Sequence, residues 1–290
     1  MSTVAGVAVV ERVADLRVAV DAVRRQGGSV GLVPTMGYLH EGHQSLVARS
    51  AADNDLTVVS IFVNPLQFAE DEDYGTYPRN LDRDMEMCAA AGAGLVFAPL
   101  TEEMYPQAPI TSVAVKGLNA VLEGLARPTH FDGVATVVAK LFSMLGPGRA
   151  YFGEKDYQQL VVIRRMAADL SLPVEVVGCP TFRVPDGLAM SSRNVYLSAD
   201  ERPAATVLWR SLQAGRDAVA EGSRDPDEVE ALMAAVLAAE PKASPDYAAA
   251  VDAATLARPD ELAGEVRLLV AARVGQARLI DNLGVDCDRL

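Results

Sequence analysis

Short apolar runs that alternate with helical patterns constrain the fold of this chain more than any other feature. The first half carries SVGLV (29–33), LTVVSIFV (56–63) and GLVFAP (94–99), with helical periodicity between them. The pattern resumes with RAYF (149–152) and VEVVGC (174–179). Strands that are apolar along their whole length are typical of a parallel sheet covered on both faces by helices. We therefore expect an α/β fold with a doubly wound parallel sheet, whose ligands bind at the carboxyl ends of the strands.

The pattern changes in the last third of the chain. Ala-rich helical segments at 199–220 and 226–239 precede three runs within 246–283 that resemble strands. This order of elements is typical of a smaller α+β domain. We predict a first domain at 1–181 and a C-terminal domain at 182–290.

Charge and composition narrow the class of protein. The chain has 290 residues and a formal net charge of −13, which argues against nucleic acid and anionic membranes as partners. Its three cysteines form no C-x-x-C pair, so a disulfide framework or a zinc finger is not indicated. The N-terminus lacks the basic start of a signal peptide, and no apolar run is long enough to span a membrane. We expect a cytoplasmic protein.

The stretch VPTMGYLHEGHQSLV (33–47) holds two of the three histidines at a predicted strand-to-helix turn. With a helix that begins near His43, both His40 and His43 lie beside unpaired backbone N–H groups and the positive end of the helix dipole. Such a place binds anions, and imidazoles can donate hydrogen bonds to phosphate oxygens. A capping role is one alternative. A zinc site is another, although the spacing differs from H-E-x-x-H.

Two further stretches supply donors at predicted turns. Lys155 stands just before a predicted helix in YFGEKDYQQL, and Ser191, Ser192 and Arg193 follow one another in GLAMSSRNVYL. Hydroxyl, ammonium and guanidinium groups at the turns of one sheet suit a polyphosphate. Each stretch has a plain alternative, as a surface lysine or as the capping region of a helix.

Six segments carry a family resemblance: VPTMGYLHEGH, SIFVNPLQF, YPR, RPTHFDGV, FGEKDYQQL and DGLAMSSRNVYL. In order and spacing they resemble the motifs of the pantothenate synthetases, or pantoate:beta-alanine ligases, which are similar to other H-x-G-H nucleotidyltransferases. The resemblance implies a Rossmann-like first domain, a small C-terminal domain and a homodimer. It also implies an AMP-forming acid–amine ligase: ATP and pantoate form a pantoyl adenylate and pyrophosphate, and beta-alanine then displaces AMP to give pantothenate.

The same resemblance assigns roles to individual residues. Catalytic roles fall to His40, His43, Lys155, Ser191, Ser192 and Arg193. ATP would be bound by Pro34, Thr35, Met36, Gly37, His40, Gly42, His43, Gly153, Glu154, Lys155, Asp156, Phe182, Met190, Ser191, Ser192 and Arg193. Pantoate and beta-alanine would be bound by Phe62, Asn64, Gln67, His130 and Gln159.

Further expectations concern the metal ion, the loop that covers the site and the alternative functions. The reaction calls for Mg²⁺ across the phosphates, and Asp84 is the candidate protein ligand, since Arg83 interrupts an acidic pair. The acidic loop 69–80 would be a flap over the adenylate. For His130, capping of the next helix is an equal alternative to a place beside pantoate. Rival functions are an adenylate-forming enzyme for another acid, a non-catalytic nucleotide-binding module and a zinc hydrolase.

Overall fold

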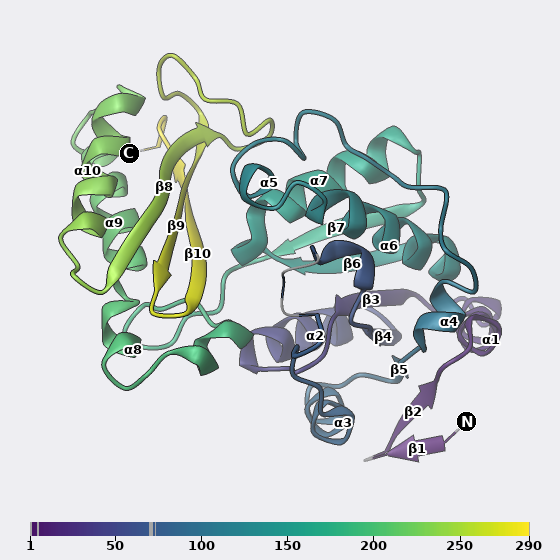
Figure 1. The fold of residues 1–290 in the computed structure, drawn as a ribbon. Coiled ribbons are helices and arrows are strands. Elements are labelled where there is room, and N and C mark those ends of the chain that lie inside the picture. The colour runs from purple at the N-terminus through teal and green to yellow at the C-terminus, as the bar shows by residue number, and fades with distance from the viewer. Residues whose placement is uncertain (1, 5, 70–71, 73, 290) are drawn as a thin grey trace. The chain divides into compact units, whose positions relative to one another are not determined.

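The computed structural model describes residues 2–4, 6–69, 72 and 74–289 (Figure 1). The chain divides into two compact units. The N-terminal unit comprises residues 1–154 and 158–180, and the C-terminal unit comprises residues 155–157 and 181–290. The short segment 155–157 therefore belongs to the C-terminal unit, although the rest of the preceding chain belongs to the N-terminal unit.

The N-terminal unit contains a seven-stranded sheet of order β1-β2-β5-β4-β3-β6-β7 (Figure 1). All its neighbouring strands pair in parallel except β1 with β2. The middle strands are buried along most of their length, as their continuous apolar sequences predicted. The predicted doubly wound parallel sheet is therefore confirmed, with two N-terminal strands added that the sequence pattern did not indicate. The strands are β1 (Ser2–Val4), β2 (Val7–Val10), β3 (Val30–Thr35), β4 (Leu56–Ile61), β5 (Leu95–Phe97), β6 (Gly148–Gly153) and β7 (Val174–Cys179).

Helices of the N-terminal unit connect these strands. The first, α1 (Val13–Arg25), buries Leu16 and Val20 on one face and ends two residues before Gly27, whose φ of +81° suits the position after a helix C-cap. The longest, α6, is buried along most of its length, and it packs against α1 and the loop after β4. The helices are α1 (Val13–Arg25), α2 (Glu41–Asp53), α3 (Leu81–Ala90), α4 (Thr101–Met104), α5 (Glu123–Ala126), α6 (His130–Leu145) and α7 (Tyr157–Asp169).

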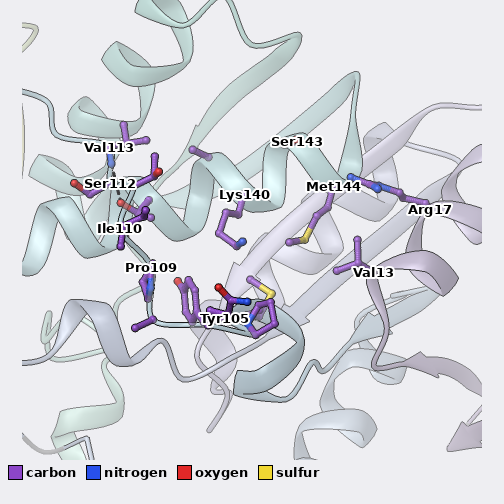
Figure 2. Close-up of a pocket in the computed structure, with 17 residues that line it drawn as sticks. Val13, Arg17, Tyr105, Pro109, Ile110, Ser112, Val113, Lys140, Ser143 and Met144 are labelled. Carbon is purple, nitrogen blue, oxygen red and sulfur yellow. Dashed lines mark hydrogen bonds between the residues drawn. The ribbon is translucent and has the colours of Figure 1, made fainter.

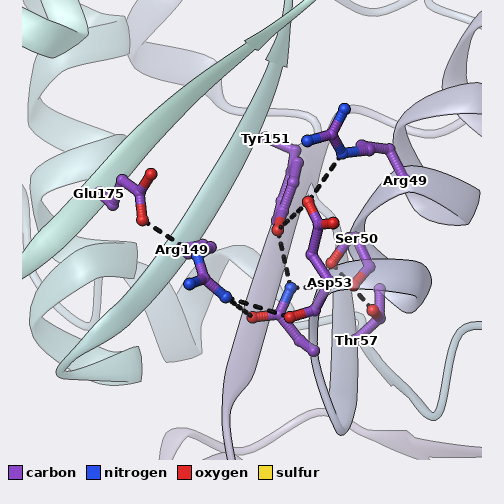
Figure 3. A network of polar contacts seen from close by, with 8 residues as sticks. Arg49, Ser50, Asp53, Thr57, Arg149, Tyr151 and Glu175 are labelled. Carbon is purple, nitrogen blue, oxygen red and sulfur yellow. Dashed lines mark hydrogen bonds and ion pairs between the residues drawn. The ribbon is translucent and has the colours of Figure 1, made fainter.

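A polar network fixes the C-terminal end of α2 to strand β6 (Figure 3). The fully buried Tyr151 donates its hydroxyl to Asp53 Oδ2 at 3.1 Å and accepts from Asn54 Nδ2 at 2.8 Å. Arg149 donates to the Asp53 carbonyl at 3.1 Å and pairs with Glu175 on β7 at 3.0 Å. A cation at a helix C-terminus stabilises its unpaired carbonyl groups. These contacts hold the C-terminal end of α2 against β6. The N-terminus of α2 lies at the carboxyl edge of the sheet because the helix follows strand β3.

The C-terminal unit is an antiparallel sheet packed against helices, so the predicted α+β class is confirmed. Its sheet has the order β10-β9-β8. Leu208, Leu212 and Met233 from the helices are buried against Leu268 and Val270 of the central strand's inner face. The elements are α8 (Glu201–Ala204), α9 (Val207–Ala220), α10 (Pro226–Ala238), β8 (Ala243–Asp252), β9 (Glu265–Val274) and β10 (Ala277–Asp286). Over the described residues, no helix of either unit has the length and apolar character needed to cross a bilayer.

Candidate active site

A cavity of about 260 Å³ lies where three adjacent parallel strands end. Met36 and Gly37 follow β3, Phe62 follows β4 and Ala98 follows β5, and Arg79 contributes a cation to the wall. Strand order reverses between β3 and β6, because β4 and β5 lie on one side of β3 and β7 lies beyond β6. Open α/β sheets bind ligands outside the carboxyl ends of the strands at such a switch point.

The turn after β3 has a strained backbone that the first turn of α3 stabilises. Gly37 has a φ of +86° and Tyr38 a φ of +49°, so two left-handed residues follow one another. Asp84 accepts hydrogen bonds from the N–H groups of Tyr38 at 2.8 Å and Leu39 at 2.7 Å. Arg83 donates to the Leu39 carbonyl at 2.8 Å. These contacts offset the cost of left-handed backbone and hold the loop that leads into α2.

Asp84, predicted to be a metal ligand, therefore stabilises the turn after β3 through its two backbone hydrogen bonds. Its carboxylate is buried, and burial raises its pKa above the ordinary value, against the opposing effect of its backbone hydrogen bonds. Among the described residues there is no group of three or more His, Cys, Asp or Glu side chains that could hold a metal ion. Mg²⁺ prefers octahedral oxygen ligands and usually keeps several waters. The described side chains at this turn therefore form no multi-ligand site for Mg²⁺ or zinc, and the role of Asp84 as a single metal ligand stays a prediction from the sequence.

Helix α2 places both histidines of the H-x-G-H motif at its N-terminus. The helix predicted to begin near His43 is confirmed, with its start at Glu41, two residues earlier, and His40 as the N-cap residue. The two rings lie 4.0 Å apart between centroids. The backbone N–H of His40 donates to His43 Nδ1 at 3.3 Å. Because Nδ1 accepts, a neutral His43 carries its proton on Nε2 and offers that N–H as a donor.

The turn after β4 brings two side-chain amides together. Asn64 precedes the short 3-10 helix Pro65–Gln67 and is 1% exposed. Its Nδ2 donates to Gln67 Oε1 at 3.2 Å and to the Gly133 carbonyl at 3.1 Å. Gln67 Nε2 in turn contacts Met36 Sδ at 3.0 Å. The amide nitrogen of Gln67 therefore lies beside Met36, in the wall of the cavity.

His130 supports Gln67 from the backbone side. It is the first residue of α6, and Thr129, rather than His130, occupies the N-cap position. His130 Nδ1 lies 3.0 Å from the Gln67 carbonyl, and Nε2 lies 3.2 Å from Arg127 Nη1. A carbonyl can only accept and a guanidinium can only donate, so the proton is on Nδ1. His130 thus links Gln67 to Arg127, which forms a bidentate ion pair with Glu72 at 2.6 Å.

The loop 69–80, predicted to be a flap, is described only in part. Residues 70, 71 and 73 lie outside the described residues. Arg79 donates to the carbonyls of Tyr74 at 3.0 Å and Tyr77 at 3.1 Å, which fastens the second half of the loop. Its role as a cover stays a prediction.

The adjacent glutamines of α7 have different environments. Gln158 is buried, accepts from the Glu123 N–H at 3.0 Å and donates to the carbonyls of Leu118 and Val121 at 2.8 Å each. Gln159, predicted to bind pantoate, is half-buried in the same helical turn. The predicted ATP contacts Gly153 and Glu154 stand at the end of β6, one of the two switch-point strands.

In the C-terminal unit, the small sheet holds the backbone of Lys155. Asn282 on β10 donates from Nδ2 to the Lys155 carbonyl at 2.7 Å. Arg267 on β9 donates to Asn282 Oδ1 at 2.7 Å and stacks on the Tyr157 ring at 3.9 Å. The Lys155 ammonium lies 3.6 Å from Asp156. The residue predicted to contact phosphate is thus positioned by side chains from the other end of the sequence.

The predicted segment at 190–193 also belongs to the C-terminal unit. Met190 N–H donates to the Phe182 carbonyl at 2.9 Å, and the Phe182 side chain is exposed. Ser191 caps the short 3-10 helix Ser192–Tyr196 by accepting from the Arg193 N–H at 3.3 Å. The capping interpretation of this stretch is therefore confirmed for Ser191, and its role on ATP stays a prediction.

An ion pair fastens this segment to β10. Arg183 pairs with the buried Asp281 through two bonds of 2.6 and 2.8 Å, and it also donates to the carbonyls of Gly187 and Asn282. Its guanidinium lies 3.9 Å from the ring centroid of Trp209. No motif in the sequence pointed to this pair or to Asn282, because their partners lie far away along the chain. Arg127 stands in the motif segment RPTHFDGV, but its ion pair with Glu72, 55 residues away, could not be predicted from it.

Comparison with known proteins decides the family. The family model described as pantoate-beta-alanine ligase matches residues 8–284. The chain belongs to the pantoate-beta-alanine ligase family. The pantothenate synthetase of Rhizobium johnstonii is 53% identical over 268 residues, which cover 92% of this chain and 88% of that protein. The pantothenate synthetase of Roseiflexus castenholzii is 55% identical over 255 residues, 88% of this chain and 92% of that protein.

Solved structures of pantoate-beta-alanine ligases have the same fold. Pantothenate synthetase from Thermus thermophilus superposes with a TM-score of 0.90 at 52% identity, over 95% of this chain and 98% of that one. Pantoate-beta-alanine ligase from Francisella tularensis, complexed with beta-gamma ATP and beta-alanine, has a TM-score of 0.79 at 30% identity, over 98% of this chain and 99% of that one. The chain is therefore a ligase that uses ATP to condense pantoate with beta-alanine.

Proposed function

We propose that this ligase works in two steps at the carboxyl edge of the N-terminal sheet, through a pantoyl adenylate. In the first step a pantoate carboxylate oxygen bonds to the α-phosphorus of ATP, and the bond from that phosphorus to the bridging oxygen breaks to release pyrophosphate. In the second step the amine of beta-alanine attacks the activated carbonyl, AMP leaves, and the amine gives up a proton. One observation carries the proposal: both histidines of the H-x-G-H motif lie at the N-terminus of α2, beside the switch point.

The charge balance of the site supports this route. The nucleophile and ATP are both anions, so their encounter requires donors and positive potential. The N-terminus of α2 supplies backbone N–H groups and its dipole, and His40 and His43 add imidazoles. The nearest buried carboxylate, Asp84, directs its oxygens to two backbone N–H groups. An interaction of this kind with developing charge is worth about 10²–10³ in rate.

We propose that Gln67 and Gln159 bind pantoate and that Phe62 lines its apolar side. An amide can donate to hydroxyl or carboxylate oxygens without adding negative charge. Gln67 is supported from both sides, by Asn64 and by the His130 contact to its carbonyl. The roles of Lys155, Ser191, Ser192 and Arg193 on the ATP phosphates stay predictions from the family resemblance.

Three finer features belong to the same proposal. Mg²⁺ would enter with ATP and neutralise phosphate charge, with water and phosphate oxygens as its ligands. The ligase would act in the cytoplasm. It would also act as a homodimer, for which an exposed surface offers support: Ile110 is fully exposed beside an apolar cavity of about 640 Å³. Light scattering on the purified chain measures the oligomeric state directly.

Pantoate-dependent exchange of labelled pyrophosphate into ATP, without beta-alanine, tests the two-step route. Exchange requires that the adenylate forms and reverts before the amine arrives. Folded protein that makes pantothenate but shows no exchange would follow a different route. A panel of small hydroxy acids in the same assay separates this function from an adenylate-forming enzyme for another acid, since a better substrate than pantoate would favour the rival.

A further inference from the structure

Tyr105, which follows α4, contacts the amide pair at the candidate pantoate site. Its hydroxyl donates to Asn64 Oδ1 at 2.9 Å. We propose that Tyr105 is a positioning residue for pantoate: its hydroxyl holds the Asn64 amide in place, and Asn64 in turn holds Gln67 so that it presents an N–H donor to the acid. This inference rests on the proposed role of Gln67 and assigns a group that keeps it in position.

The amide of Asn64 has all its hydrogen-bonding positions occupied by protein. The two Nδ2 hydrogens go to the Gly133 carbonyl and to Gln67 Oε1. Oδ1 accepts from the Leu66 N–H at 3.3 Å and from the Tyr105 hydroxyl. A primary amide has two donor hydrogens and two acceptor lone pairs, so nothing remains for substrate. Asn64, predicted to bind substrate, therefore acts through Gln67 instead.

These contacts leave one orientation for the two amides. A flipped Asn64 would direct its NH₂ group at the Leu66 N–H and its oxygen at the Gly133 carbonyl, which opposes donor to donor and acceptor to acceptor. With Asn64 so oriented, the atom of Gln67 that faces Nδ2 has to be an oxygen. The Leu66 N–H and the Gly133 carbonyl thus set the orientation of Asn64, and the Tyr105 hydroxyl, whose contact is the shortest of the four, holds the amide in place.

Gln67 is thereby left with its NH₂ group directed to Met36, one of the residues that line the 260 Å³ cavity. That group contacts the thioether of Met36, which is a weak acceptor. A hydroxyl or carboxylate oxygen makes a stronger bond, so an incoming acid replaces a poor partner with a good one. An ammonium group has no lone pair for this donor. The orientation therefore presents a donor to a hydroxyl or carboxylate oxygen and disfavours the ammonium end of beta-alanine at Gln67.

The surroundings of Tyr105 keep its hydroxyl a donor. The ring forms part of the wall of the 640 Å³ cavity, which α6 also lines (Figure 2). Phe62 lies 6.1 Å away between ring centroids, and the Lys140 ammonium lies 5.4 Å from the Tyr105 centroid. Burial raises the pKa of Tyr105 to about 12, so the phenol is protonated at neutral pH.

Tyr105→Phe tests the inference in the pyrophosphate exchange assay. Loss of one hydrogen bond is worth about two- to tenfold, so we expect KM for pantoate to rise by that factor while KM for ATP is unchanged. Tyr151→Phe is the matched control. It also removes the hydroxyl of a buried tyrosine that contacts an asparagine, but this asparagine, Asn54, lies at the C-terminal end of α2, away from the candidate pantoate site. The control should lower the melting temperature and leave KM for pantoate unchanged.

A double-mutant cycle with Gln67→Ala separates positioning from general loss of structure. If Tyr105 acts through Gln67, then Tyr105→Phe raises KM for pantoate in the wild-type chain and has no further effect in the Gln67→Ala variant. An unchanged KM for pantoate, an equal rise for ATP, or additive effects in the cycle would overturn the inference. The proposed function fails separately, through absence of exchange in the wild-type chain.

Discussion

Removal of one partner from the buried ion pair between Arg183 and Asp281 should destabilise the C-terminal unit strongly. Asp281→Asn removes the charge that faces the guanidinium and replaces one accepting oxygen with an amide donor. The side chains of Arg183 and Asp281 are 16% and 2% exposed, so the cation left behind cannot recover its hydration. Removal of one partner from a buried pair costs about 3–5 kcal/mol. Because the amide keeps one acceptor and Gly187 and Asn282 still accept, we expect a cost of about 3 kcal/mol.

Trp209 reports this change directly. It is the single tryptophan of the chain, and Arg183 stacks on it. Urea unfolding of the full chain, followed by tryptophan fluorescence, measures the free energy of unfolding of the surrounding unit. The matched control is Asp246→Asn, which breaks a more exposed pair with Arg278 in the same sheet and should cost at most about 1 kcal/mol. Equal costs for the two variants would refute the assignment of Asp281 as the dominant charge partner.

Three other predictions concern the N-terminal unit. His43→Ala should slow pantoate-dependent exchange by roughly a hundredfold or more, and a loss confined to the transfer to beta-alanine would contradict its role. Burial raises the pKa of Glu72, but the hydrogen bond and charge of Arg127 lower it by more, so the pKa in the folded protein lies below the ordinary value of 4.5. The ion pair therefore stabilises the folded state fully above pH 4.5, and this stabilisation is lost as the pH falls through the lower pKa of the folded state. The difference in unfolding free energy between wild type and Glu72→Gln, about 1 kcal/mol, should be constant from pH 6 to 8 and shrink below about pH 4.5, whereas a difference independent of pH would exclude the ion pair as its source. Gly133→Ala would place a Cβ 2.2 Å from the Leu66 carbonyl oxygen, so it should raise KM for pantoate more than KM for ATP, and unchanged pantoate kinetics would show that the turn tolerates the displacement.

The sequence predicted the sheet well because its strands are marked locally. Continuous apolar runs identify buried parallel strands, and VEVVGC coincides with β7 from Val174 to Cys179. The strands β1 and β2 were not predicted, since they are only three and four residues long and lie at the sheet edge. The start of α2 was placed two residues late, because His40 serves as N-cap although histidine is not a preferred capping residue.

The site could be predicted only as far as motifs extend. The two histidines were placed correctly at a helix N-terminus because the motif is contiguous. The saturation of Asn64 depends on Tyr105 and Gly133, which are 41 and 69 residues away, so no local pattern could reveal it. Likewise Gln158 and Gln159 are adjacent residues of the same type, and only the fold shows that Gln158 donates to the backbone carbonyls of Leu118 and Val121.

The grouping of residues 155–157 with the C-terminal unit matters for anyone who divides the gene. A fragment that stops at residue 180 would still encode Lys155 yet lack Asn282, the side chain that holds its carbonyl. Adding the missing half as a separate polypeptide would have to restore that contact across a break in the chain. The boundary near residue 180 therefore does not separate the two units completely. Split or chimeric versions should exchange residues 155–157 together with residues 181–290.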